Sequence, residues 1–207
     1  MYKHIIWDFD GTLFDSYPTM ALAFKAALEE EGIHESSDKI MGLMKVSVPH
    51  LFDYYIRNYK VSDRLGPNFE RYREELEADN IRPFLNVEEI CRRIYQSKRT
   101  NHLYTHRGKS SIEFLKKYGM YEYFSGFITK ENDFKRKPDP EALLFLINEY
   151  KMDKSEALMI GDRDIDILAA KNAGIAACYY KDNQIHDCET ADYTITDYDQ
   201  LSKIIGI

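Results

Sequence analysis

The sequence predicts an α/β protein in which a doubly wound parallel sheet, a Rossmann-like core, carries an inserted helical cap domain. After about residue 82, short apolar segments alternate with amphipathic segments of helical length, whereas residues 15–81 hold only helical patterns. Nearly continuous apolar strands that alternate with helices are typical of parallel sheets covered on both faces. We therefore expect a core built from residues 1–14 and 82–207 and a helical domain of residues 15–81.

The chain opens with a pattern for a buried strand and then one for a helix. Residues 4–9 are mainly β-branched or aromatic and end at the turn signal Asp10-Gly11-Thr12. Residues 16–31 carry apolar side chains at three- and four-residue spacing, and Gly32 follows them. This spacing and the glycine stop predict an amphipathic helix.

The inserted domain continues with helical signals. A Ser-Ser-Asp sequence at residues 36–38 caps a segment that runs to Lys45, and Pro49 lies near the start of a segment that ends at about Tyr59. Residues 68–78 are rich in Glu and Arg with little β-branching, which favours a third helix there. We expect no strand between residues 16 and 80.

Strands and helices alternate in the remainder of the chain. The Asp139-Pro140 pair predicts an N-cap followed by a proline at the first helical position, and Gly174 predicts a helix end. The expected helices cover residues 87–96, 110–118, 140–150, 165–173 and the C-terminus; the expected strands cover residues 102–105, 126–129, 157–160, 175–179 and, more weakly, 193–195.

The composition limits the class of protein and of partner. Hydrophobic residues make up 44% of the 207 positions, which is enough for a sizeable core and excludes general disorder. The chain has 35 acidic and 28 basic residues and a net charge of −7. This balance argues against a nucleic-acid partner bound through phosphate neutralisation. The oligomeric state does not follow from the sequence.

Cysteine usage and hydropathy predict a soluble cytoplasmic protein. The three cysteines form no C-x-x-C pair, which fits neither a disulfide framework nor a zinc site. The apolar stretch at the N-terminus is too short for the core of a signal peptide. No segment approaches the ~18 apolar residues of a membrane helix, so we expect no membrane partner.

Acidic residues dominate the positions that follow the expected strands. In open α/β sheets, ligands bind beyond the carboxyl ends of the strands. Carboxylates crowded at that edge repel each other unless a cation joins them, and an all-oxygen set suits Mg²⁺ better than zinc. The candidate residues are Asp8, Asp10, Thr105, His106, Asp162, Asp164 and Asp166.

Three other ligand-binding motifs do not fit the sequence. A P-loop requires a glycine where Leu103 stands, and a calcium-binding EF-hand loop requires Gly and Glu where Ile167 and Ala173 stand. No G-x-G-x-x-G sequence follows the first strand, so a dinucleotide site lacks its phosphate-binding turn.

Four sequence motifs resemble those of the haloacid dehalogenase-like hydrolase superfamily, and they occur in its order. The resemblance spans essentially the whole chain, because the helical insertion falls where one branch, which includes phosphoglycolate phosphatases and β-phosphoglucomutases, inserts a small helical cap. The motifs are DFDGTL at residues 8–13, Thr105 at a strand end, KPDP at residues 137–140 and GDRDID at residues 161–166.

The resemblance implies a covalent phosphatase mechanism with Mg²⁺. By analogy, Asp8 is the nucleophile that attacks phosphorus, and Asp10 is the general acid that protonates the leaving oxygen and later activates water. The same analogy implies that Mg²⁺ is held by Asp8, the Asp10 backbone carbonyl and Asp162, with Asp166 in support.

The resemblance also implies the residues that contact the substrate. Thr105 would hydrogen-bond the phosphoryl oxygens and Lys137 would neutralise them. His106 stands where the family commonly has Asn, which makes it a candidate phosphate contact that departs from the family pattern. Arg163 replaces a commoner small residue; of two roles, an ion pair with Asp164 or a contact with substrate, we expect the structural ion pair. In the cap, Lys45 is a possible substrate contact.

Charge counting favours the same chemistry. The carboxylates of Asp8, Asp10, Asp162 and Asp166 would join a phosphate of about two negative charges, whereas Mg²⁺ and Lys137 return only three positive charges. Close like charges raise the pKa of a carboxyl group, so one carboxyl is expected to keep its proton, as a general acid requires.

These observations predict a Mg²⁺-dependent phosphatase that hydrolyses a small phosphorylated metabolite, phosphoglycolate-like or a sugar phosphate, through an aspartyl-phosphate. One alternative is a phosphotransferase of the β-phosphoglucomutase kind, in which a sugar hydroxyl intercepts the same intermediate. Another is a non-catalytic binding or regulatory module on the same fold. Carbon–halogen hydrolysis is disfavoured, because that branch lacks the second aspartate of the first motif and Asp10 is present here.

Overall fold

The structure is a computed structural model that describes residues 1–182 and 187–207. These residues form two compact units, one of Met1–Phe14 with Pro83–Ile207 and one of Asp15–Arg82. The chain leaves the first unit through β2 (Phe14–Asp15) and returns through β3 (Arg82–Pro83), and these two strands pair with each other. Each strand has only two residues, too few for a periodic sequence pattern to reveal it.

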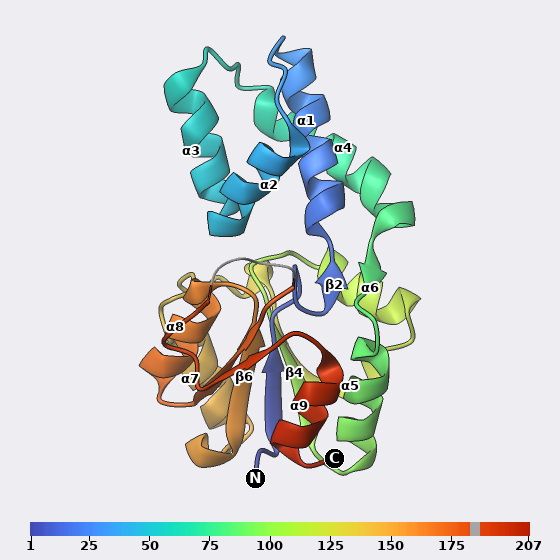
Figure 1. The fold of residues 1–207 in the computed structure, drawn as a ribbon, viewed down its shortest axis with the longest axis vertical. Helices are drawn as coiled ribbons and strands as arrows, with labels where there is room; N and C mark the ends of the chain where they lie inside the picture. The colour runs from blue at the N-terminus through green and yellow to red at the C-terminus, as the bar shows by residue number, and fades with distance from the viewer. Residues whose placement is uncertain (183–186) are drawn as a thin grey trace. The chain divides into compact units, whose positions relative to one another are not determined.

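A six-stranded sheet forms the centre of the first unit among the described residues, in the order β5-β4-β1-β6-β7-β8. Figure 1 shows the blue strand β1 between β4 and β6. The paired neighbours are all parallel. The strand order therefore reverses between β1 and β6, which is the topological switch point of a doubly wound fold. The fold class predicted from the sequence is confirmed. The strands are β1 (His4–Trp7), β4 (Thr100–Tyr104), β5 (Phe124–Ile128), β6 (Ala157–Gly161), β7 (Ala176–Tyr180) and β8 (Tyr193–Ile195).

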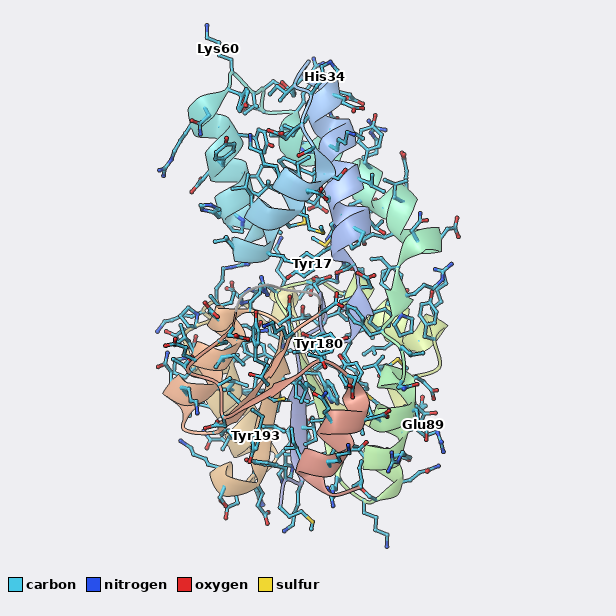
Figure 2. The ribbon with its side chains drawn as sticks, in the orientation of Figure 1. Tyr17, His34, Lys60, Glu89, Tyr180 and Tyr193 are labelled. Atoms are coloured by element: carbon cyan, nitrogen blue, oxygen red, sulfur yellow. The ribbon has the colours of Figure 1, made fainter. Side chains whose placement is uncertain are left out.

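Helices cover both faces of this sheet. Ile6 of β1 lies in one buried cluster with residues of α7 (Glu141–Glu149) and α8 (Asp164–Ala173). Its neighbour Trp7 points to the opposite face. There the ring of Trp7 lies 5.9 Å from that of Tyr198. Tyr180, which is labelled in Figure 2, stacks on Tyr198 with ring centroids 5.0 Å apart. The remaining helices of the unit are α5 (Val87–Gln96), α6 (Ser110–Lys117) and α9 (Tyr198–Ile205).

The second unit is helical and has its own core. Ser36 and Ser47 accept hydrogen bonds from the backbone N–H groups of Lys39 and His50, so they cap the second and third helices. Aromatic rings around Phe24 fill the interior. The helices are α1 (Tyr17–Glu30), α2 (Ser37–Val46), α3 (Val48–Asn58) and α4 (Leu65–Asn80). Of the helices in both described ranges, none has the length and apolar character needed to cross a membrane.

Several element boundaries differ by one to three residues from the sequence expectation, among them the starts of β4 and α7. β4 begins at Thr100, two residues earlier than predicted, because the polar Asn101 is buried there. It accepts a hydrogen bond from Trp7 Nε1 and donates to two backbone carbonyls. The helix after Asp139 begins at Glu141 with Pro140 as its N-cap, one residue later than expected, although Asp139 Oδ1 still accepts the Glu141 N–H at 3.0 Å.

Two histidines that share one hydroxyl partner, the buried His102 and the half-buried His4, predict acid sensitivity of the first unit. The Thr100 hydroxyl oxygen lies 2.8 Å from His4 Nδ1 and 2.9 Å from His102 Nε2. Burial lowers the pKa of His102 from 6.5 to about 3 and also lowers the pKa of His4. Below pH 6.5 the unfolded chain therefore binds protons that the folded protein excludes, and stability falls with falling pH.

We expect His102→Asn to be less stable than the wild type near pH 7 but to lose less stability on acidification. Between neutral pH and about pH 5, the free energy of unfolding should fall by about 2 kcal/mol more for the wild type than for His102→Asn. Urea unfolding followed by the fluorescence of Trp7, the single tryptophan, measures the first unit directly. His34→Asn, at an exposed histidine of the second unit, is the matched control and should keep the wild-type slope. Parallel pH profiles for His102→Asn and the wild type would contradict the expectation.

Candidate active site

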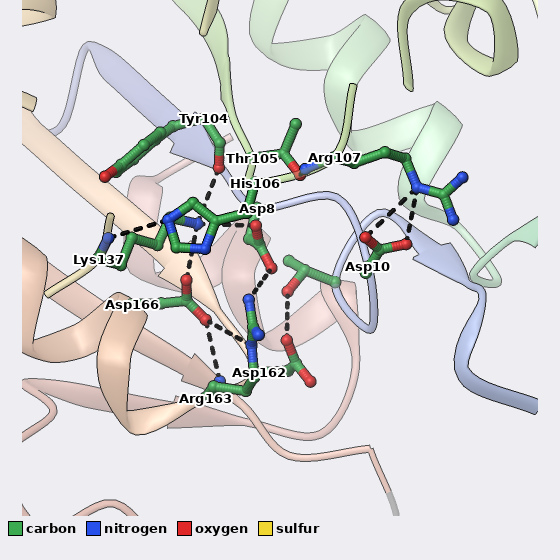
Figure 3. A network of polar contacts seen from close by, with 11 residues as sticks. Asp8, Asp10, Tyr104, Thr105, His106, Arg107, Lys137, Asp162, Arg163 and Asp166 are labelled. Carbon is green, nitrogen blue, oxygen red and sulfur yellow. Dashed lines mark hydrogen bonds and ion pairs between the residues drawn. The ribbon is translucent and has the colours of Figure 1, made fainter. Parts of the chain in front are cut away.

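The polar residues that follow the central strands meet at the carboxyl edge of the sheet (Figure 3). Asp8 follows β1, and its N–H donates to the carbonyl of Ile160 in β6 at 2.9 Å. Thr105 follows β4, and its N–H donates to the carbonyl of Ile128 in β5 at 2.9 Å. Both residues therefore continue the ladders of the sheet, which fixes their backbones. Asp162 follows β6, next to β1 at the switch point.

Three buried carboxylates converge at this edge. Oxygens of Asp8, Asp162 and Asp166 all lie within 4.8 Å of one another. Asp166 reaches the group from the first turn of α8, where its Oδ2 accepts the Arg163 N–H at 3.2 Å. Gly161 permits this approach, because a Cβ atom at this position would lie 2.3 Å from the Cβ of Asp166.

A buried lysine balances part of this negative charge. The ammonium of Lys137 lies 2.7 Å from Asp8 Oδ1 and 2.7 Å from Asp166 Oδ1, and it donates to the carbonyl of Tyr104 at 2.9 Å. Burial opposes the charged form of Lys137, but the carboxylates of Asp166 and Asp8 outweigh it and raise its pKa. The ammonium therefore donates to Asp8 and to the Tyr104 carbonyl and forms an ion pair with Asp166, which holds the charge in place.

The carboxyl group of Asp8 remains in an environment of excess negative charge. Burial, and next the nearby Asp166, raise the pKa of Asp8 to about 6, against the opposing effect of Lys137 and Arg163. Asp8 Oδ2 accepts no hydrogen bond from the described residues and lies 3.6 Å from Arg163 Nη2. Three carboxylates and an oxygen with spare acceptor capacity are the donor chemistry of a hard divalent cation, so these residues fit a magnesium site.

The turn after β1 presents Asp10 beside this group. Gly11 adopts a positive φ of 76°, and the N–H groups of Gly11 and Phe14 close the turn on the carbonyls of Phe14 and Phe9. Asp10 is ion-paired with Arg107, a residue that the sequence analysis did not single out. Arg107 could have been identified from its position in the sequence, two residues after Thr105 at the end of a strand.

The residue after Thr105 has a defined tautomer. His106 Nε2 accepts the backbone N–H of Lys137 at 2.9 Å, so the ring proton must be on Nδ1. Burial, followed by the charges of Lys137, Arg136 and Arg163, lowers the pKa of His106 to about 2. The imidazole is therefore neutral. Its Nδ1–H is buried and has no acceptor among the described residues.

The structure brings most of the predicted site residues together within the first unit. The guanidinium of Arg163 lies 3.6 Å from Asp8 and 3.7 Å from Asp166. Lys45 belongs to the second unit, where its ammonium lies 5.5 Å from the ring centroid of Tyr17, and a substrate contact for it stays a prediction. The residues that meet in the first unit are Asp8, Asp10, Thr105, His106, Lys137, Asp162 and Asp166.

Known proteins resemble the chain along most of its length. Residues 5–179 match the family of haloacid dehalogenase-like hydrolases. A Clostridium perfringens protein named as pyrophosphatase PpaX is 30% identical over 186 residues, which cover 87% of this chain and 85% of that protein. The phosphoglycolate phosphatase of Vibrio parahaemolyticus is 26% identical over 220 residues, covering 99% and 96%. A crystal structure of a protein from Haemophilus somnus, described as a phosphoglycolate phosphatase, gives a TM-score of 0.84 at 22% identity and covers 98% and 97% of the two chains.

The chain belongs to the haloacid dehalogenase-like hydrolase family. The resemblance stated from its motifs is thus confirmed, as is the class of enzyme, a hydrolase of the phosphatase kind.

The close approach at Gly161 yields a stability prediction. We expect Gly161→Ala to lower the free energy of unfolding by about 1–3 kcal/mol, because the added methyl group overpacks Asp166. Urea unfolding followed by Trp7 fluorescence measures the change.

Gly42→Ala, at an exposed position inside α2 of the second unit, is the control. A methyl group added there has no heavy atom within 4 Å, and alanine favours a helix more than glycine does. We expect this control not to lower the free energy of unfolding. Equal unfolding midpoints for both variants would contradict the role assigned to Gly161.

Proposed function

We propose that this protein is a Mg²⁺-dependent phosphatase that hydrolyses a small phosphorylated metabolite through a phosphorylated Asp8. The observation that carries the proposal is the buried Asp8 carboxylate itself. It lies at the carboxyl end of the central strand, pairs with Lys137 at 2.7 Å and retains an oxygen that accepts no hydrogen bond from the described residues. A carboxylate held in this way can serve as a nucleophile.

The donor set supports Mg²⁺ as the cation. Asp8, Asp162 and Asp166 would hold it, because their oxygens already lie within 4.8 Å of one another and all three side chains are buried. When bound, Mg²⁺ supplies positive charge that polarises a phosphoryl oxygen. The relatives do not identify the metal, so its identity rests on this oxygen chemistry.

Lys137 serves two purposes in the proposed reaction. Its ammonium lowers the pKa of Asp8 against the effects of burial and of Asp166, which favours the anionic nucleophile. The same fixed charge offsets the negative charge of an incoming phosphoryl group. Phosphoryl transfer depends mainly on such positioning and charge stabilisation.

Thr105 and His106 are the proposed donors to the phosphoryl oxygens. The Thr105 oxygen accepts the N–H of Arg107 at 3.0 Å, which leaves the hydroxyl proton available for donation. The Nδ1–H of neutral His106 is buried without an acceptor among the described residues. An anionic oxygen would satisfy this donor, and the positive charges that lower the pKa of His106 would attract the same oxygen.

Asp10 is the proposed acid and base. In the first step an oxygen of Asp8 bonds to phosphorus while the bond from phosphorus to the leaving oxygen breaks, and the Asp10 carboxyl proton passes to that oxygen. In the second step water attacks phosphorus, its proton passes to the Asp10 carboxylate and the Asp8–phosphate bond breaks. The second step releases inorganic phosphate and regenerates both side chains.

The names of the relatives support a small anionic substrate. They include phosphoglycolate phosphatase and pyrophosphatase, so 2-phosphoglycolate and pyrophosphate join sugar phosphates as proposed substrates. Isomerisation of a sugar phosphate without release of phosphate would instead indicate a phosphotransferase of the β-phosphoglucomutase kind.

Phosphate release from a panel of these compounds, with and without Mg²⁺, tests the proposal. We expect turnover only with Mg²⁺, and we expect Asp8→Asn to reduce it by at least about 10⁴-fold because the nucleophile is lost. Asp164→Asn, at an exposed carboxylate two positions after Asp162, is the matched control and should retain most of the activity.

Full Mg²⁺-dependent turnover by Asp8→Asn would refute the covalent route. A folded wild-type protein that releases no phosphate from any compound of the panel would refute the phosphatase proposal.

A further inference from the structure

The carboxylate of Asp10 is held by one buried arginine. Arg107 Nε lies 3.0 Å from Asp10 Oδ1 and 3.4 Å from Asp10 Oδ2 (Figure 3). The Arg107 side chain is 1% exposed, whereas that of Asp10 is 18% exposed. The guanidinium therefore supports the carboxylate from the protein interior, and the carboxylate keeps an accessible side.

Arg107 is itself held in place before it meets Asp10. Its guanidinium carbon lies 5.2 Å from the ring centroid of Phe9 and 5.9 Å from that of Phe114, within the range of cation–π attraction. Its Nη1 donates to Ser110 Oγ at 3.4 Å, and its backbone N–H donates to Thr105 Oγ1 at 3.0 Å. A planar group fixed on several sides can define the orientation of a carboxylate that lies in a turn.

The basic residues of the site contact different aspartates. Lys137 and Arg163 lie next to Asp8 and Asp166, whereas Arg107 lies next to Asp10. The two contacts that orient the acid and the nucleophile are therefore separate, and one can be removed without removing the other.

We propose that Arg107 is the positioning residue for Asp10, holding its carboxyl group where it can protonate the leaving oxygen. This inference rests on the proposed function, in which the Asp10 proton passes to that oxygen as its bond to phosphorus breaks. Without Arg107, the Asp10 side chain can rotate towards solvent, and proton transfer loses its preorganised geometry.

The leaving group distinguishes this role from a structural one. An alkyl phosphate such as 2-phosphoglycolate must receive a proton on its departing oxygen, because an alkoxide is a poor leaving group. The 4-nitrophenolate that departs from 4-nitrophenyl phosphate is a stable anion and does not need the proton. Both esters share the later hydrolysis of the phosphorylated Asp8, in which Asp10 acts as the base. The comparison therefore uses kcat/KM, which reports only the steps up to departure of the leaving group. Loss of the acid's position lowers kcat/KM for the alkyl phosphate more than for 4-nitrophenyl phosphate, whereas general damage to the site lowers both.

Arg107→Met removes the charge and keeps an apolar stem beside Phe9 and Phe114. With Mg²⁺ present, we expect kcat/KM for 2-phosphoglycolate, or for the best alkyl phosphate of the panel, to fall by about 10²-fold or more. We expect kcat/KM for 4-nitrophenyl phosphate to fall by less than about 10-fold, since general acid catalysis contributes little to departure of its leaving group. Arg107→Lys keeps a positive charge and should show a smaller loss with the same selectivity.

Two further variants make the comparison specific. Arg92→Met removes a surface ion pair with Glu89 in α5 and should change neither reaction. Because Arg107 acts through Asp10, the double variant Arg107→Met with Asp10→Asn should be no slower on the alkyl phosphate than Asp10→Asn alone. The unfolding midpoint from Trp7 fluorescence shows that each variant is folded under assay conditions.

The outcomes separate this inference from the proposed function. Equal losses on both esters, no loss on either, or additive effects of the Arg107 and Asp10 substitutions would refute the role of Arg107 while the wild type remains a phosphatase. A wild type without Mg²⁺-dependent turnover of either ester would instead refute the proposed function.

Discussion

The ammonium of Lys137, buried between Asp8 and Asp166, is the interaction on which the site depends. It lies 2.7 Å from an oxygen of each carboxylate, and Arg163 lies 3.6 Å from Asp8. These two positive charges still do not balance the three buried carboxylates of Asp8, Asp162 and Asp166. Burial and the negative charge of Asp166 accordingly raise the pKa of Asp8. A divalent cation would relieve this repulsion, so the same charge excess that costs stability also creates affinity for a metal. The excess negative charge at this edge of the sheet thus connects the fold with the proposed metal chemistry.

The topology of the fold brings the acidic residues together. The reversal of strand order between β1 and β6 brings Asp8 and Asp162 to neighbouring strand ends, although they are far apart in the sequence. Gly161 lets the first turn of α8 approach closely enough for Asp166 to join them. The turn at Gly11 and the guanidinium of Arg107 place Asp10 beside this group, with a separate set of contacts. The nucleophile and the proposed acid are thus held by different parts of the chain.

Much of this arrangement could be predicted because parallel strands have a simple geometric rule. Their carboxyl ends share one edge, so acidic residues after the first strand and after residues 157–160 were expected to meet, and the structure brings Asp8 and Asp162 together there. Contacts that no periodicity encodes could not be predicted. Arg107 and Asp10 are 97 positions apart, and nothing in the local pattern links them. The tautomer of His106 follows from a single backbone N–H, that of Lys137, which only the folded chain presents. The start of β4 was missed because Asn101 is a buried polar residue whose hydrogen-bond partners come from three other segments.

The most direct test of the charge-excess account is Mg²⁺ binding, measured without substrate. Isothermal titration calorimetry, together with the Tm as a function of Mg²⁺ concentration, should show saturable binding to the wild type and a Tm that rises with the free Mg²⁺ concentration. Asp162→Asn removes one of the three carboxylates without touching the Lys137 contacts, and we expect it to weaken binding by about 10-fold or more. Equal Mg²⁺ affinity in the two proteins, or no binding to the wild type, would contradict the account.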